Sequence, residues 1–405
     1  EPVAPVAVDD EFGVRPGAVA QLPVMLNDFD ANGDVLSIVA DSDFGLDSAF
    51  GQARLVNQGQ ALAVTVRPGA KGTATLRYRL TDGTRTDGLY SDWATVRLRI
   101  LSDTVNTAPQ HCDELGDDCL QPWPEPQVQP GGAIAVPVLS GWHDAEGDAI
   151  YLQSAEFRGV APGTVIATAG GEVVYRHPNP SGGAATVTIT VTVADARGAT
   201  TTKDLVVRVT PSPSLTVAPF TVQTVPGQRL AIDPGPYLDG VSGTWRLVAA
   251  KTDNEQAASV ELDGERHIVF TATNPGEHQL SYTVADDTTE RVGSIRVTVL
   301  PRSQAAIAVA PLTAFVHGKV DSTVDVMPAV HNPAGLPLVV TSAQWRSGTG
   351  NEVEVVEQRL LRIRSGGNQT GVIGVIRYEL SDGSGSALGR AQGELVVVAV
   401  EASGQ

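Results

Sequence analysis

Two short stretches of the chain concentrate carboxylate and amide oxygens around a glycine. They run from residue 27 to 36 (NDFDANGDVL) and from residue 144 to 150 (DAEGDAI). A hard cation such as calcium requires six to eight oxygen ligands at about 2.5 Å, and glycine permits the sharp turn that brings them together. The two stretches therefore predict calcium loops. The candidate ligands are Asp28, Asp30 and Asp34 in the first loop and Asp144 and Asp148 in the second.

A turn without any cation explains the same residues. Asp and Asn side chains accept hydrogen bonds from their own backbone in tight turns, and glycine supplies the positive φ that such turns require. The first stretch begins like an EF-hand loop, but Val39 stands where that loop needs its final glutamate, so an EF-hand is excluded. Both interpretations, calcium and a plain turn, remain open for the two loops.

Two further aspartates end alternating apolar and polar runs. Asp82 and Asp195 follow residues 78–81 and 191–194, each of which has the pattern of a strand. Asp82 precedes Gly83, a dipeptide typical of tight turns, and a turn alone accounts for it. The functional alternative is that each aspartate folds back beside the acidic loop of its own domain as an additional calcium ligand.

The two cysteines, Cys112 and Cys119, are separated by six residues, a spacing that suits no common zinc or redox motif. A local disulfide is the favoured interpretation, and it predicts an oxidising, extracytoplasmic environment. Free thiols in a linker are the alternative. Trp123 lies between two prolines in the same insertion, residues 111–126, where it could stack on a sugar or a partner, or cover a domain junction.

Composition excludes several classes of function. The net charge of −18 argues against nucleic-acid binding, which requires clustered lysine and arginine. The longest apolar runs have the length of a strand, so no segment is expected to insert into a membrane. The seven histidines are scattered, and no nucleophile elbow, zinc helix or phosphate loop occurs. We therefore expect no enzymatic activity and no required cofactor.

The elements that must position these residues are strands. A signature of alternating residues that ends at an aspartate recurs four times, at 78–82, 191–195, 282–286 and 378–382, and a second alternating run follows each copy. The four aspartates lie 113, 91 and 96 positions apart, a period long enough for each unit to bury its own core. The chain is thus predicted to be all-β, with helices of at most one turn. The predicted domains are residues 1–102, residues 103–210 with the insertion 111–126, residues 211–301 and residues 302–405.

Short linkers that contain proline, at 211–214 and 301–304, favour a semi-rigid arrangement of these domains. Strands of about ten residues at roughly 3.3 Å per residue make each domain ~35 Å long, so an elongated row would measure ~140 Å. We expect the insertion to pack near the junction between the first two domains, and the chain to be a monomer.

Three segments carry a family resemblance: residues 4–10 (APVAVDD), the first acidic loop, and residues 78–83 (YRLTDG). Together they resemble the cadherin-like and immunoglobulin-like tandem repeats of large secreted or surface-anchored bacterial proteins, and the use of arginine over lysine is similar to actinobacterial examples. The resemblance implies Greek-key sandwiches and export. It also implies calcium in repeats one and two, bound by Asp28, Asp30, Asp34 and Asp82 and by Asp144, Asp148 and Asp195.

The sequence therefore predicts a non-enzymatic stalk or scaffold segment of a larger extracellular or cell-surface protein, with calcium in repeats one and two as an open question. Its partner would be an unidentified surface protein or glycan. One alternative is a glycan- or protein-binding module that uses Trp123 and the loops at the domain ends. Another is an accessory region of an envelope enzyme whose catalytic domain lies elsewhere.

Overall fold

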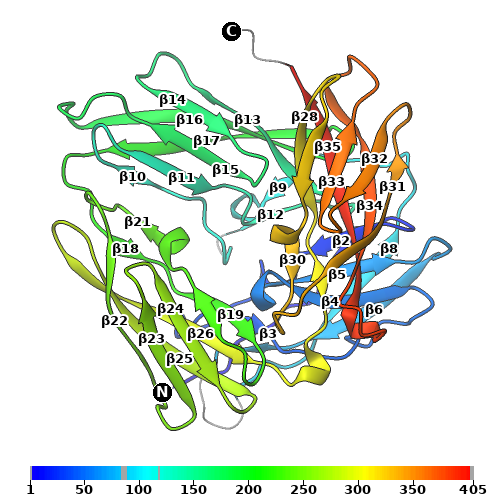
Figure 1. The fold of residues 1–405 in the computed structure, drawn as a ribbon, viewed down its shortest axis with the longest axis horizontal. Coiled ribbons are helices and arrows are strands. Elements are labelled where there is room, and N and C mark those ends of the chain that lie inside the picture. Colours follow the sequence, from blue (N-terminus) through cyan, green and yellow to red (C-terminus); the bar gives the residue numbers. More distant parts are fainter. Residues whose placement is uncertain (1, 84–88, 117–118, 402–405) are drawn as a thin grey trace.

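The computed structural model describes residues 2–83, 89–116 and 119–401. The described chain consists of strands and single 3-10 turns, which confirms the all-β prediction. The strands group into four sandwiches (Figure 1), each containing a four- or three-stranded sheet, a second three-stranded sheet and a short two-stranded ribbon. In every sandwich, one sheet has its first strand paired in parallel with its last strand, as β1 is with β8.

Sandwich 1 contains the sheets β1-β8-β6 and β2-β5-β4 and the ribbon β3-β7. Its elements are β1 (Asp10–Val14), β2 (Val19–Leu22), β3 (Ser37–Ile38), β4 (Gly51–Val56), η1 (Asn57–Gly59), β5 (Ala61–Val66), β6 (Thr73–Tyr78), β7 (Leu80–Thr81) and β8 (Ala94–Ile100).

Sandwich 2 contains the sheets β10-β17-β16-β13 and β11-β15-β14 and the ribbon β12-β9. Its elements are β9 (Gln110–His111), η2 (Cys112–Glu114), β10 (Gln127–Val128), β11 (Ala133–Pro137), β12 (Trp142–His143), β13 (Ile150–Phe157), β14 (Thr164–Ala167), β15 (Glu172–Arg176), β16 (Ala185–Asp195) and β17 (Thr200–Val209).

Sandwich 3 contains the sheets β19-β26-β25-β22 and β20-β24-β23 and the ribbon β18-β21. Its elements are β18 (Thr216–Val217), β19 (Phe220–Thr224), β20 (Leu230–Ile232), η3 (Gly235–Tyr237), β21 (Leu238–Asp239), β22 (Arg246–Thr252), β23 (Ala258–Asp263), β24 (His267–Ala272), β25 (Gly276–Ala285) and β26 (Glu290–Val299).

Sandwich 4 contains the sheets β28-β35-β34-β31 and β29-β33-β32 and the ribbon β27-β30. Its elements are η4 (Arg302–Gln304), β27 (Ala308–Val309), β28 (Leu312–His317), β29 (Ser322–Asp325), η5 (Met327–Ala329), β30 (Val330–His331), β31 (Val339–Ser347), β32 (Glu352–Val356), β33 (Leu360–Arg364), β34 (Gly371–Ser381), η6 (Ala387–Gly389) and β35 (Arg390–Val400).

Alternation along the strands builds a separate core in each sandwich. In β25, Leu280, Tyr282 and Val284 are buried, while the residues between them are at least partly accessible. A period of two places such residues on one face of a sheet, which then packs against the facing sheet. The signature tyrosines Tyr78, Tyr282 and Tyr378 are all buried in these cores, as the strand pattern predicts.

The predicted elongated row is wrong, because the four sandwiches fold back on one another into a compact block (Figure 1). Arg54 of sandwich 1 donates hydrogen bonds to the carbonyl oxygens of Ile307 and Ala387 in sandwich 4, at 2.6 and 2.7 Å. Gln60 of sandwich 1 donates to the Thr221 hydroxyl of sandwich 3 at 2.9 Å. Contacts between residues so far apart in the sequence cannot form in a linear row.

The physical reason for the compact arrangement is an apolar outer sheet face. In β35, Leu395 and Val397 point into the core, but Val396 and Val398 on the opposite face are also buried, only 1% and 3% exposed. They pack in one cluster with Tyr151 and other residues of sandwich 2. Each Å² of this apolar face that the neighbouring sandwich removes from water stabilises the compact arrangement by about 25 cal/mol.

Candidate functional site

The first acidic loop, residues 27–36, is a turn organised by one carboxylate. The Oδ1 atom of Asp30 accepts hydrogen bonds from the backbone N–H groups of Asn32 and Asp34, both at 2.9 Å. Gly33 has a φ of 73°, the left-handed conformation that this turn requires. The turn interpretation of the sequence thus describes the backbone, and it leaves the second oxygen of Asp30 available.

Three of the predicted ligands converge at this loop. Carboxylate oxygens of Asp30, Asp34 and Asp82 lie within 4.8 Å of one another, and Asp82 reaches the loop from the end of β7. Asp30 is 9% exposed, and its Oδ2 atom is buried without a hydrogen-bond partner among the described residues. A buried oxygen of this kind, beside two other carboxylates, suits a cation, because burial without a partner costs about 1–3 kcal/mol.

Asp28 lies at a different place from the other predicted ligands. Its Oδ1 accepts a hydrogen bond from the Val8 N–H at 2.8 Å, and both its oxygens lie within 3.0 Å of the Tyr78 hydroxyl. The same hydroxyl lies within 3.2 Å of the Asp10 carboxylate and of the Val24 carbonyl oxygen. One hydroxyl proton cannot serve all these acceptors. Burial raises the pKa of Asp28, and burial together with the Asp28 charge raises that of Asp10.

An arginine from sandwich 3 closes the first acidic loop. Arg296 of β26 is 2% exposed and donates hydrogen bonds to the carbonyl oxygen of Val35 and, at 2.7 Å, to the Ser37 hydroxyl. Its charge lowers the pKa of Asp34, although burial and the neighbouring carboxylates raise that pKa overall. Arg296 therefore donates its hydrogen bonds to neutral oxygens of the loop, and its charge acts on the loop's carboxylates only by electrostatic attraction at a distance.

The second acidic loop, residues 144–150, repeats the same turn. The Oδ1 atom of Asp144 accepts from the backbone N–H groups of Glu146 and Asp148 at 3.0 and 2.9 Å, and Gly147 has a φ of 71°. Burial, together with nearby carboxylates, raises the pKa of Asp144 to about 7. The carboxylate oxygens of Asp144, Glu146 and Asp148 lie within 4.8 Å of one another, so this loop also concentrates negative charge.

The carboxylates around Asp144 already have donors. Arg15 of sandwich 1 reaches across to Asp148 with two nitrogens, at 2.7 and 2.6 Å. Glu146 accepts from the Thr107 N–H and hydroxyl, both at about 3.0 Å. Asp195 accepts from the Asn106 amide at 2.9 Å. Bidentate contacts between arginine and carboxylate are strong because both hydrogen bonds are charge-assisted. A positive charge therefore already occupies this loop.

Comparison with known proteins assigns the first two sandwiches. Residues 2–96 and 121–208 match the model of the bacterial Ig domain family. These two sandwiches are similar to bacterial Ig domains. The matched segments and the sheets confirm the predicted tandem immunoglobulin-like fold and the predicted resemblance to bacterial repeats. Bacterial Ig domains are typically extracellular and suggest a non-catalytic module.

The solved structures that match this chain share little sequence with it. The N-terminal four Ig domains of Dscam1 isoform 6.9 are 10% identical with a TM-score of 0.28, and the match covers 99% of this chain and 100% of that one. Human desmocollin-1 is 13% identical with a TM-score of 0.21, over 99% and 80%. An endo-fucoidan hydrolase of glycoside hydrolase family 107 is 14% identical with a TM-score of 0.22, over 74% of this chain and 45% of its own length. This chain thus spans under half of the length of that hydrolase. A search of curated proteins found no match to this chain.

The insertion of the second Ig domain is a structural element. Cys112 and Cys119 form the predicted disulfide, and residues 117–118 between them lie outside the described part of the chain. The Leu120 N–H donates to the Leu26 carbonyl oxygen of the first Ig domain, so the insertion lies at the junction between the two. None of the described helices is long and apolar enough to cross a membrane.

Trp123 is engaged by its own domain. Its indole N–H donates to the Asp204 carbonyl oxygen at 2.9 Å, and its ring packs edge-to-face against His111 and Trp142. The ring is half-buried against the core of the second Ig domain. This placement gives Trp123 a packing role and leaves little of the ring for a ligand.

Sequence reasoning missed the residues that complete the two loops. The predicted calcium ligands of the second loop do not include Glu146, although its position beside Gly147 is a usable signal. Arg15 and Arg296 carry no such signal, because each is a single arginine that acts on another domain. Only the tertiary arrangement brings their guanidinium groups to the acidic loops.

Proposed function

We propose that this chain is a non-enzymatic structural module of a larger exported, surface-bound or secreted protein, which presents an adhesive or envelope function. The observation that carries this proposal is the set of arginines that join separate sandwiches, of which Arg15 and Arg296 are buried. Arg15 joins the first to the second, Arg296 joins the third to the first, and Arg54 joins the first to the fourth. Such contacts make a rigid block that holds its attachments at fixed positions.

The immunoglobulin-like fold and the disulfide support an extracellular location, where oxidising conditions maintain such bonds. The partner would be a surface protein or glycan, and the module is proposed to act as a monomer. No residue constellation in the described chain favours the alternative in which Trp123 binds the partner, since Trp123 packs on its own domain.

Calcium belongs to this proposal at the first acidic loop only. Asp30, Asp34 and Asp82 would hold the ion, and the unpartnered Oδ2 atom of Asp30 fits it. Asp144 of the second loop also has an unpartnered Oδ2 atom, so the two loops differ in the arginine that binds the second one. At the second acidic loop, the guanidinium of Arg15 supplies the positive charge through Asp148. Bound calcium would supply charge neutralisation and rigidity, while the turn itself is held by backbone hydrogen bonds.

Small-angle X-ray scattering on the full chain tests the rigid block. A compact chain of this length has a radius of gyration of about 22 Å, whereas a rod of ~140 Å would give roughly 40 Å. We expect the compact value, and we expect Arg54→Ala to increase it by releasing sandwich 4. A value near that of the rod for the unaltered chain would overturn the proposed block and restore an extended stalk.

A further inference from the structure

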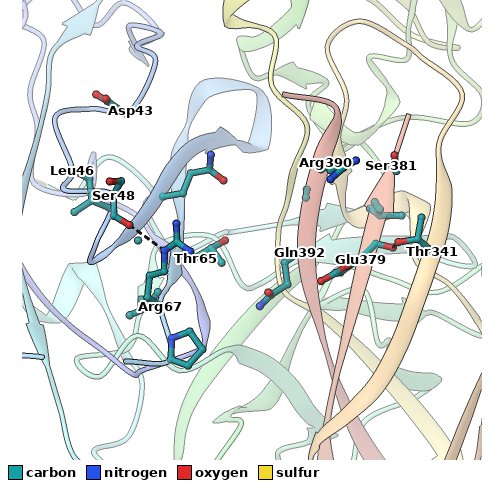
Figure 2. Close-up of a pocket in the computed structure, with 16 residues that line it drawn as sticks. Asp43, Leu46, Ser48, Thr65, Arg67, Thr341, Glu379, Ser381, Arg390 and Gln392 are labelled. Carbon is teal, nitrogen blue, oxygen red and sulfur yellow. Dashed lines mark hydrogen bonds between the residues drawn. The ribbon is translucent and has the colours of Figure 1, made fainter. Parts of the chain in front are cut away.

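A cleft lies between sandwich 1 and sandwich 4 (Figure 2), and neither sandwich contains it alone. Its volume is about 760 Å³, within the range of roughly 300–1,000 Å³ that small-molecule sites occupy. One wall is formed by β4, β5 and the segments beside them, and the other by β31, β34 and β35. The cleft therefore depends on the contact between these two sandwiches.

Two arginines hold that contact. Arg54 donates to backbone carbonyl oxygens of sandwich 4, including those of Ile307 and Ala387, and Arg377 of sandwich 4 donates to the Gly17 carbonyl oxygen of sandwich 1. An apolar cluster of Val56, Ala61, Ala63 and Ala308 lies at the same interface. The two walls are thus fixed relative to each other, which lowers the cost of ordering a ligand between them.

The charged side chains on the two walls cancel in formal charge. Arg67 and Asp43 come from the first wall and Arg390 and Glu379 from the second (Figure 2). The cleft is electrically balanced although the whole chain carries a net charge of −18. A balanced lining gives no net attraction to an anionic or cationic ligand. It therefore favours a neutral one.

The remaining lining provides both donors and acceptors, beside apolar surface of similar extent. Gln52 and Thr65 on one wall face the cleft together with Gln392 and Thr341 on the other. Among the apolar residues of the lining, Leu46 and Leu380 are 5% and 1% exposed and belong to the cores, whereas Pro68 is exposed. A chain of hydroxyl groups, each both donor and acceptor, matches this surface.

We propose that this cleft binds a short, neutral oligosaccharide that bridges sandwiches 1 and 4. None of the described lining residues is aromatic, so hydrogen bonds supply the affinity, which is expected to be in the range of about 0.1–1 mM. The site is separate from Trp123 and from both acidic loops; it rests on the docking of sandwiches 1 and 4 in the proposed block, and not on what the module presents.

Isothermal titration calorimetry of the full chain with maltotriose, cellotriose and mannotriose, and with trigalacturonate as the charged comparison, tests the proposal. We expect at least one neutral trisaccharide to bind. Gln52→Ala and Gln392→Ala, one on each wall, should each weaken binding about three- to tenfold, the loss of one or two hydrogen bonds. Gln369→Ala, an exposed glutamine outside the cleft, is the matched control and should leave binding unchanged.

Arg54→Ala tests the dependence on both walls and should abolish detectable binding when scattering shows that the sandwiches have separated. Failure of every neutral trisaccharide to bind at about 10 mM would overturn the proposal. Stronger binding of trigalacturonate, or unchanged binding by both glutamine variants, would also overturn it. None of these outcomes alters the radius of gyration of the unaltered chain, so the scaffold proposal stands or falls separately.

Discussion

The two acidic loops share one turn and differ in what faces their carboxylates. In each loop an aspartate, Asp30 or Asp144, accepts two backbone hydrogen bonds through Oδ1 and buries an unpartnered Oδ2. Arg15 binds the carboxylate of Asp148 in the second loop directly, whereas Arg296 reaches the first loop through Val35 and Ser37. The same turn can therefore bind an arginine of another sandwich, or it can remain available to an ion from solution.

This difference teaches that an acidic loop cannot be assigned from its own residues. The turn is local, because its hydrogen bonds connect residues two to four positions apart. The positive charge is not local, since Arg15 and Asp148 are 133 positions apart in the sequence. The charge that faces each loop thus depends on the docking of neighbouring sandwiches.

The largest expected effect comes from removing the arginine of the second loop. Arg15 is 4% exposed and Asp148 is 10% exposed, so Arg15→Ala would leave a buried carboxylate without its partner. Breaking such a pair costs about 3–5 kcal/mol. Chemical denaturation should show this loss in the free energy of unfolding.

Arg99→Ala is the matched control for that experiment. Arg99 pairs with Glu11 at 2.8 Å, but the two side chains are 58% and 51% exposed, and exposed pairs contribute about 0–1 kcal/mol. Equal effects of the two substitutions would show that Arg15 is not a buried anchor of the second loop.

The sequence predicted the local part of this arrangement and missed the long-range part. Alternation along strands such as β25 was sufficient for the sandwiches, and the spacing of Asp30, Asp34 and Asp82 was sufficient for their convergence. Asp28 does not lie with the other predicted ligands, because its carboxylate contacts the buried Tyr78 hydroxyl. The compact block had one usable signal, the unbroken apolar run from 395 to 400 in β35, which is typical of a strand buried on both faces. The linkers alone do not indicate in which direction the chain turns between one sandwich and the next.

A second test uses the pH dependence of the second loop. The pKa of Asp144 is raised to about 7 in the folded chain and is near 3.8 when unfolded, so the folded state binds its proton more tightly. That stabilisation is complete below the unfolded pKa and is lost as the pH rises through about 7. At roughly 1.4 kcal/mol per pH unit, unfolding at pH 5 should cost about 3 kcal/mol more than at pH 8.

Asp144→Asn isolates this contribution. Asparagine keeps the Oδ1 acceptor for both backbone N–H groups but cannot titrate, so the profile of the variant should be flatter between pH 5 and 8. Asp10 and Asp28 have raised pKa values and act in the same direction in both proteins, so only the difference between the two profiles is informative. Parallel profiles would exclude Asp144 as the titrating group.

A third test asks whether the first loop alone binds calcium. At a calcium concentration a hundred times the dissociation constant, a bound ion stabilises the folded chain by about 2.7 kcal/mol. We expect thermal unfolding in calcium and in chelator to differ for the unaltered chain and for Asp144→Asn. Asp30→Asn should remove the difference. Superimposable curves for the unaltered chain would overturn the calcium proposal, and loss of the shift in Asp144→Asn alone would move the site to the second loop.

The smallest expected effect concerns Glu146 of the second loop. Its carboxylate accepts hydrogen bonds from Thr107, which lies in the linker between β8 and β9 (residues 101–109). Thr107→Val keeps the shape of the side chain and the backbone N–H donor to Glu146 at 3.0 Å, but it removes the hydroxyl donor at the same distance. Losing one hydrogen bond to a charged group costs about 1.5 kcal/mol, so the midpoint of denaturation should fall slightly. Thr104→Val, on an exposed threonine of the same linker, should have almost no effect. If Thr107→Val were also neutral, the backbone donor and Arg15 would suffice to hold the second loop. Its distinction from the first loop would then rest on the arginine alone.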